Sequence, residues 1–334
     1  MTTCGSLPKL LWPSSTRIQY VDVPHWVEES LKTSFPRVNV VIARDEETLY
    51  REIEDCEIFV SGNLKPEQFA RCRKLKWIHS PAAGVGQLLS PALVESDVVV
   101  TNARTVHAVP VAEHAIALLL ALARRLPDCF RYQAEAVWGH NEIHHGRYLP
   151  TEINGKTLGL VGLGCIGREV AVRAKVLGMR VVAVKQNPSP CSEFADRIYS
   201  PQHLADMLSK VDYVVVAAPD TPETRHMIGE KELHRMKPAA FIVNISRGSL
   251  VDTEALRRAL ESGAIAGAAL DVTEPEPLPP GHPLWRAPNI LIAHHLGGAT
   301  DRFWPRQADL LTENLRRYLA GEPLLNPVDK RRGY

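Results

Sequence analysis

The stretch Thr157-Leu-Gly-Leu-Val-Gly162-Leu-Gly164-Cys-Ile-Gly167-Arg-Glu169 decides the fold of this 334-residue chain. It begins with an apolar run that is typical of a buried parallel strand, continues through a glycine-rich turn and enters a segment with helical spacing of apolar residues. A second apolar run, at residues 180–184, follows Gly178. This order of strand, turn, helix and strand predicts a βαβ unit and therefore a parallel sheet.

Each glycine of the turn can have its own role. Gly162 permits a tight turn where the strand ends, and Gly164 lets the backbone approach a ligand because no side chain intervenes. Gly167 allows the helix and the strand to pack closely. The helix N-terminus, which includes Cys165 and Ile166, offers N–H groups and a positive dipole end to phosphate. The turn therefore predicts a dinucleotide site, although a βαβ unit without a nucleotide stays open on this motif alone.

The residue after the second strand bears on the choice of dinucleotide. An Asp or Glu about 20 residues beyond the turn commonly holds the ribose 2′-OH of NAD. This chain has Lys185 there, followed by Gln186 and Asn187. An ammonium group attracts a 2′-phosphate, whereas a carboxylate repels it. The sequence therefore favours NADP(H), with NAD(H) as the alternative if Lys185 is merely an exposed lysine.

The composition argues against several classes of protein. With 39 basic and 38 acidic residues the net charge is +1, so nothing indicates a nucleic-acid partner or an anionic membrane surface. The longest strongly apolar run, residues 115–123, is too short to span a bilayer, and the N-terminus lacks a signal-peptide pattern. The six cysteines form no C-x-x-C pair, which argues against a zinc site and a disulfide framework and favours the cytoplasm.

Strands alternate with helices in both halves of the chain, which is typical of parallel α/β domains. A chain of this length exceeds one comfortable core, so we expect a dinucleotide-binding domain at residues 102–296 and a substrate-binding domain from residues 1–101 and 297–334. Pro110 suits the first turn of a long apolar helix. Further strands are expected at residues 18–23, 38–43, 58–60, 77–79, 211–218, 241–244, 265–270 and 290–293, and helices at 26–34, 46–54, 65–74, 110–124, 168–177, 253–262 and 301–319.

Three apolar strands of the second half end in polar residues. The carboxyl ends of parallel strands line the ligand crevice of such a sheet, so we expect these side chains to converge on one cofactor. The three segments are Asn244-Ile-Ser246-Arg247-Gly248, Asp271-Val-Thr-Glu-Pro-Glu276 and His294-His295-Leu-Gly297.

Taken in order, these segments resemble the D-isomer-specific 2-hydroxyacid dehydrogenase family. The resemblance also includes the glycine turn and the loop Pro219-Asp-Thr-Pro-Glu-Thr224-Arg225. It implies two Rossmann-like domains with parallel sheets, a flavodoxin-like substrate domain and an NAD(P)-binding Rossmann domain. The stretches Trp77-Ile-His-Ser80 and 105–114 look closest to glyoxylate and hydroxypyruvate reductases.

The resemblance assigns roles to the polar residues. Arg247 looks like the substrate anchor, whose planar guanidinium can grip a carboxylate and polarise the adjacent ketone. His295 looks like the acid/base, and Glu276 like the carboxylate that favours its imidazolium form near neutral pH. Asp271 is expected on the nicotinamide side of the cofactor. His294 is the competing choice of histidine, and we choose His295 because it directly precedes Leu-Gly as in the family.

Other residues enter the predicted sites through the same resemblance. Those expected at the cofactor are Gly162, Gly164, Cys165, Ile166, Gly167, Lys185, Pro219, Thr224, Ser246, Arg247, Asp271 and His295. Those expected at the substrate are Ala83, Gly84, Val85, Arg247 and Trp285. Trp138 could reach across a dimer interface and Trp304 could shape a pocket, although ordinary packing is the simpler explanation.

The sequence thus predicts an enzyme that reduces a 2-oxo acid, similar to glyoxylate or hydroxypyruvate, to a D-2-hydroxy acid with NAD(P)H. The resemblance implies a homodimer. A nucleotide-sensing binding protein of the corepressor type is the main alternative, and a formate or phosphonate dehydrogenase is a lesser one. Glu276 argues against formate, because formate dehydrogenases usually carry glutamine there. No metal is expected, since the spacing of His140, His144 and His145 matches no ligand motif.

Overall fold

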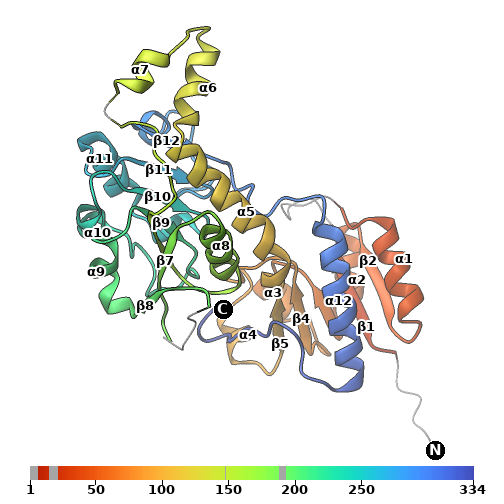
Figure 1. The fold of residues 1–334 in the computed structure, drawn as a ribbon. Coiled ribbons are helices and arrows are strands. Elements are labelled where there is room, and N and C mark those ends of the chain that lie inside the picture. The colour runs from red at the N-terminus through yellow and green to blue at the C-terminus, as the bar shows by residue number, and fades with distance from the viewer. Residues whose placement is uncertain (1–6, 15–21, 147, 188–192) are drawn as a thin grey trace, which may run out of the picture. The chain divides into compact units, whose positions relative to one another are not determined.

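The chain forms two compact units. Unit 1 comprises Met1–His107 and Thr300–Tyr334, and unit 2 comprises Ala108–Ala299. Each contains one all-parallel sheet with helices (Figure 1), so the protein is α/β with two Rossmann-like units, as the sequence predicts. The computed structural model describes residues 7–14, 22–146, 148–187 and 193–334.

The sheet of unit 1 has five strands. They are β1 (Lys9–Pro13), β2 (Asn39–Ala43), β3 (Ile58–Val60), β4 (Trp77–Ser80) and β5 (Val99–Asn102). Their spatial order is β2-β1-β3-β4-β5, the flavodoxin-like order. The strand expected at residues 18–23 falls mostly outside the described residues, and residues 22 and 23 are not in a strand. The first strand of the described residues is instead β1, whose apolar run was overlooked in the prediction.

Helices cover both faces of this sheet. They are α1 (His25–Ser34), α2 (Glu46–Glu52), α3 (Pro66–Phe69), α4 (Pro91–Glu95) and α12 (Phe303–Ala320). Leu10 and Trp12 pack with α1 and α12 on one face, whereas Leu11 and Phe59 pack with α2 and α4 on the other. Because successive strand residues point to opposite faces, a run such as Leu10-Leu11-Trp12 is buried throughout.

The sheet of unit 2 has seven strands. They are β6 (Thr157–Val161), β7 (Arg180–Val184), β8 (Arg197–Tyr199), β9 (Tyr213–Val216), β10 (Phe241–Asn244), β11 (Gly267–Leu270) and β12 (Ile290–Ile292). Their order is β12-β11-β10-β9-β6-β7-β8. Counted from β6, this is the dinucleotide-binding order with one added strand, and the direction of winding reverses between β6 and β9.

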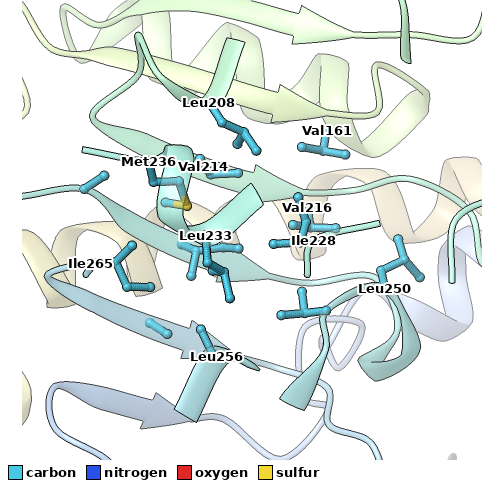
Figure 2. Packing of buried hydrophobic residues seen from close by; sticks show 14 of the residues in the cluster. Val161, Leu208, Val214, Val216, Ile228, Leu233, Met236, Leu250, Leu256 and Ile265 are labelled. Atoms are coloured by element: carbon cyan, nitrogen blue, oxygen red, sulfur yellow. The ribbon is translucent and has the colours of Figure 1, made fainter. Parts of the chain in front are cut away.

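The core of unit 2 lies on both faces of β9. The helices of this unit include α8 (Cys165–Val176), α9 (Leu204–Leu208), α10 (Glu230–Arg235) and α11 (Thr253–Ser262), with short 3₁₀ turns at Pro201–His203, Gly248–Leu250 and Pro283–Arg286. Figure 2 shows Val214 and Val216 among Leu208, Leu233 and Leu256, which come from α9, α10 and α11. The alternate residues of β9 face α8 on the opposite side of the sheet.

The apolar helix α5 (Arg104–Ala123) begins earlier than the sequence predicts. Pro110 was expected in its first turn but lies inside the helix, a position that removes one backbone hydrogen bond. Oδ1 of Asn102 accepts from the N–H of Arg104 at 3.4 Å, which helps to start the helix sooner. Among the described residues this helix alone is long and apolar enough to cross a membrane, but most of it is buried within the protein, as a core helix is.

Two further helices of unit 2, α6 (Leu126–Ala134) and α7 (His140–His144), were not predicted. Figure 1 shows them as an arm that extends beyond the sheet of unit 2. The arm carries apolar side chains that are open to solvent, since Trp138 is 90% exposed and Phe130 is 61% exposed. Patterns of buried apolar residues do not predict such an arm, because the arm buries little of its own surface.

Candidate active site

The glycine turn follows β6, where the winding of unit 2 reverses. Gly162 has a φ of +104°, and a Cβ there would lie 2.7 Å from the backbone of Ala217. A Cβ at Gly167 would collide with the carbonyl oxygen of Gly162, whereas one at Gly164 would meet open space. Gly162 therefore permits the close approach of the segment after β9, and Gly167 permits the packing of α8 on the turn. Gly164 leaves the approach to the helix end open. This cradle fits a phosphate group.

The first turn of α8 includes Cys165 and Ile166, whose N–H groups lie at the open end of the helix. Lys185 directly follows β7, and its backbone N–H donates to the carbonyl of Tyr199 at 3.0 Å. The carboxyl end of β7 lies beside that of β6. Lys185 therefore stands at the same edge of the sheet as the glycine turn.

The loops after β9 and β10 are joined by hydrogen bonds. The hydroxyl of Ser246 donates to the carbonyl of Ala218. Oγ1 of Thr224 donates to the carbonyl of Pro219 at 2.7 Å. Pro219, Thr224 and Ser246 thus lie together at the carboxyl edge of neighbouring strands.

A histidine and a carboxylate from different strand ends meet in unit 2. Nδ1 of His295, which follows β12, lies 2.5 Å from Oε1 of Glu276, in the loop after β11. Their side chains are 24% and 34% exposed, so the pair is accessible. Burial alone would raise the pKa of Glu276, but His295 and, to a smaller extent, Arg247 lower it.

Arg247 follows β10 and is held by its neighbours. Its guanidinium donates to the carbonyl of Ser246 at 2.7 Å, and its own carbonyl accepts from Nδ2 of Asn244 at 2.8 Å. The next residue, Gly248, lies against the backbone of Thr273 in the loop that carries Glu276, and the positive charge of Arg247 helps to lower the pKa of Glu276. The ends of three adjacent strands, β10, β11 and β12, supply Arg247, Glu276 and His295.

Asp271 anchors the turn that carries His295. Its backbone carbonyl accepts from the N–H of His295 at 2.6 Å. Its carboxylate accepts from the N–H groups of Leu296, at 2.7 Å, and Gly297, at 3.0 Å. The residue is only 4% exposed. The buried carboxylate of Asp271 therefore holds the turn at His295 in place through two backbone N–H groups.

His114 of α5 is a residue that the sequence reading did not assign to the site. Its Nε2 lies 3.1 Å from Oδ1 of Asp271, an ion-pair distance without hydrogen-bond alignment. Burial would raise the pKa of Asp271, but His114 and the two N–H donors outweigh it and lower that pKa. The contact joins residues far apart in the chain, so no local pattern could have revealed it.

The two adjacent histidines point to different partners. Both have positive φ angles, +56° at His294 and +57° at His295, a conformation that is uncommon for residues other than glycine. The ring of His294 packs on that of Trp285, with centroids 5.8 Å apart, whereas His295 faces Glu276. Nε1 of Trp285 donates to the carbonyl of Pro279 at 3.0 Å.

The loop after β4 in unit 1 contains Ala83, Gly84 and Val85. Its carbonyls bond within the unit, since Ala83 accepts from Nδ2 of Asn102 at 2.8 Å and Val85 accepts from the N–H of Leu88 at 2.9 Å. The N–H groups of residues 83–85 make no hydrogen bond to any described residue. The loop therefore presents a short series of donors.

The three histidines at positions 140, 144 and 145 lie close together, the first two on α7 and the third directly after it. The ring centroids of His140 and His144 are 5.6 Å apart, and those of His144 and His145 are 5.2 Å apart. Within the described ranges no group of three or more His, Cys, Asp or Glu side chains has an arrangement that could hold a metal ion.

The chain is similar in sequence to a known protein family and to individual enzymes. The family profile of the D-isomer specific 2-hydroxyacid dehydrogenase NAD binding domain matches residues 116–297. A glyoxylate reductase from Korarchaeum cryptofilum is 37% identical over 294 residues, which cover 85% of this chain and 86% of that protein.

Solved structures of two reductases have a fold similar to that of this chain. A glyoxylate reductase from Paecilomyes thermophila has a TM-score of 0.81 at 28% identity, covering 97% of this chain and 99% of the other. An NADPH-dependent glyoxylate/hydroxypyruvate reductase from Sinorhizobium meliloti, in complex with NADP and malonate, has a TM-score of 0.77 at 27% identity, covering 98% of each chain.

Proposed function

The chain belongs to the D-isomer specific 2-hydroxyacid dehydrogenase family, and on that basis we propose that it reduces a small 2-oxo acid, similar to glyoxylate or hydroxypyruvate, to the D-2-hydroxy acid. Membership makes the protein a nicotinamide-dependent oxidoreductase. The observation that carries the finer proposal is the bonded pair of His295 and Glu276 with Arg247 nearby.

The chemistry follows from these three side chains. The hydride is supplied by the reduced nicotinamide when the cofactor is bound. Arg247 grips the substrate carboxylate and polarises the ketone. Because Nδ1 of His295 faces Glu276, its Nε2 donates the proton to the new alkoxide. The negative charge of Glu276 favours the imidazolium that supplies this proton.

The proposal keeps the other substrate-binding residues that the family resemblance implies, each considered within its own unit. In unit 1, the N–H groups of residues 83–85 receive the substrate carboxylate, so this unit is the substrate-binding domain. In unit 2, Trp285 helps to shape the substrate pocket. Support for the loop assignment comes from its carbonyls, which are already bonded within unit 1.

The dinucleotide is proposed to lie across the carboxyl edge of unit 2. The glycine turn with Cys165 and Ile166 holds the pyrophosphate, and Pro219, Thr224 and Ser246 line the path toward Asp271. Lys185 binds a ribose 2′-phosphate, so NADP(H) is favoured over NAD(H). The support is the place of Lys185 after β7, beside the turn.

We further propose a cytoplasmic homodimer. The α6–α7 arm exposes Phe130, Val137 and Trp138, and apolar side chains grouped on a surface commonly mark an interface. The described cysteines, Cys56, Cys72, Cys129 and Cys165, are free, in accord with a reducing compartment. Light scattering of the wild type and of Trp138→Asp tests the dimer, with a loss of mass expected for the variant.

One experiment tests the proposed activity. The purified protein is assayed with NADPH and NADH against glyoxylate, hydroxypyruvate, pyruvate and bulkier 2-oxo acids. We expect oxidation of NADPH with the small acids in particular. If neither cofactor is oxidised with any acid while cofactor binding is retained, the corepressor-type alternative replaces the enzyme.

A further inference from the structure

A buried series of polar contacts runs beneath the loop that follows β4. Nε1 of Trp77 donates to Oγ1 of Thr101 at 2.8 Å, and this hydroxyl lies 3.0 Å from Nδ1 of His79. His79 and Thr101 are direct partners across β4 and β5. A hydroxyl both accepts and donates, so Thr101 can give its own proton to Nδ1 of His79.

His79 has no route to solvent. It is 1% exposed, and burial lowers its pKa to about 4 although a contact with Gln307 opposes the shift. The ring is therefore neutral at neutral pH. In the part of the chain that is described, its buried Nε2 has no partner with hydrogen-bond geometry. The adjoining amide of Gln307, itself 1% exposed, supplies the oxygen that can satisfy it.

Gln307 also reaches the loop. Its Nε2 donates to the carbonyl of Pro81 at 2.6 Å, and Nε2 of His107 lies 3.0 Å from the same oxygen. A carbonyl can only accept, so His107 carries its proton on Nε2. Two buried side chains, one from α12 and one from α5, thus fix a single carbonyl at the start of the loop.

The carbonyls of the next two residues are also hydrogen-bonded within unit 1. That of Ala82 accepts from the N–H of Ala103 at 3.0 Å, and that of Ala83 accepts from Asn102. Three successive carbonyls are thus bonded within unit 1, whereas the N–H groups of Gly84 and Val85 bond to no described residue and are left for an anion. Successive N–H groups of this kind form a concave anion site.

We propose that Gln307 and His79 are positioning residues, which hold the loop of residues 81–85 so that its N–H groups can receive a carboxylate. The inference rests on the proposed reduction of a 2-oxo acid. Neither side chain touches the substrate. Gln307 acts through Pro81, and His79 acts through Gln307.

The test compares Gln307→Met with a matched control, Asn314→Leu. Asn314 lies on the same helix, is fully buried and also makes two hydrogen bonds, both to Leu325. Both variants replace a buried amide by an apolar side chain of similar size. We expect Gln307→Met to raise KM for the 2-oxo acid about tenfold, with kcat and KM for NADPH within about twofold, as the loss of one positioning contact implies. The control should leave all three unchanged.

Hydrogen exchange measured by mass spectrometry gives a second readout. The amides of residues 81–86 should exchange faster in Gln307→Met but not in Asn314→Leu. Equal KM values and equal exchange in the two variants would overturn the inference. If the wild type turns over no 2-oxo acid, the proposed function fails, while the exchange comparison still decides whether Gln307 orders the loop. If Gln307→Met does not fold, Thr101→Val is the second variant, because it removes the hydroxyl that contacts His79. It should also raise KM for the 2-oxo acid and speed the exchange of residues 81–86.

Discussion

Oε1 of Glu276 and Nδ1 of His295 lie 2.5 Å apart, although the two residues come from separate loops at the ends of β11 and β12. The contact depends on the left-handed conformation of His295 and on the bonds from its turn to Asp271. The backbone conformation thus directs the imidazole of His295 toward the carboxylate of Glu276.

Replacement of Glu276 by glutamine should move the pH profile of reduction toward acid. In the proposed mechanism the carboxylate stabilises the positive charge of the proton-donating imidazole, and a neutral amide does not. We expect the basic limb of kcat/KM to begin at a lower pH in Glu276→Gln than in the wild type. Glu274→Gln is the control, because Glu274 bonds to Arg225 and His226 instead. Identical profiles for the two variants would remove Glu276 from this role.

Alanine substitution at each position should distinguish the roles of His294 and His295. His295→Ala should lower kcat by about 10²- to 10⁴-fold, the usual contribution of a general acid, while NADPH binding followed by fluorescence stays nearly unchanged. His294→Ala should cost much less, because His294 packs on Trp285. A larger loss in His294→Ala would transfer the acid/base role to that residue.

Asp271→Asn should loosen the turn that carries His295 and change how the stability of the fold depends on pH. An amide cannot accept at both positions, so one buried N–H loses its partner at a cost of about 1–3 kcal/mol. The pKa of Asp271 is lower in the folded state. Its stabilising contribution is therefore present above the unfolded pKa and is lost as the pH falls through the folded pKa. Urea unfolding should show a clear gap between wild type and variant at pH 7 that narrows below about pH 4. A gap that is independent of pH would contradict this account.

Alanine substitutions at Gly164 and Gly167 should have different effects, because the two positions have different surroundings. Gly164→Ala meets open space, so it should cost less than about 1 kcal/mol in stability but weaken NADPH binding at least about tenfold by blocking close approach. Gly167→Ala meets the carbonyl of Gly162 and should destabilise unit 2 outright. Thermal unfolding and calorimetric titration of both variants check the contrast. Wild-type affinity in Gly164→Ala would exclude a pyrophosphate at this position.

Lys185→Asp should shift preference from NADPH toward NADH, because a carboxylate repels the 2′-phosphate and can bond to a ribose hydroxyl. The ratio of kcat/KM for the two cofactors should change by about tenfold or more, as expected for one charge-assisted contact. Lys231→Asp, an exposed change on α10, controls for net charge. If both variants keep the wild-type ratio, the 2′-phosphate assignment is wrong.

The sequence by itself determined the fold class. The glycine turn, the apolar strands around it and the alternation with helices specify parallel α/β units, because strand burial and tight turns leave local patterns. The confirmed family assignment also follows from ordered motifs. The predictions failed at three places: at β1, whose apolar run was overlooked, at Pro110, which lies inside α5, and at the arm of α6 and α7, which buries little of its own surface.

Only the tertiary structure decided which side chains meet. His114 reaches Asp271 from α5, and Gln307 reaches Pro81 from α12. Hydrogen bonds and ion pairs of this kind join residues more than 150 and 220 positions apart, and nothing in the neighbouring sequence specifies the partner. The sequence therefore supplied the types of residue for the proposed hydride-transfer site, and the packing of helices against the sheets determined what holds each of them in place.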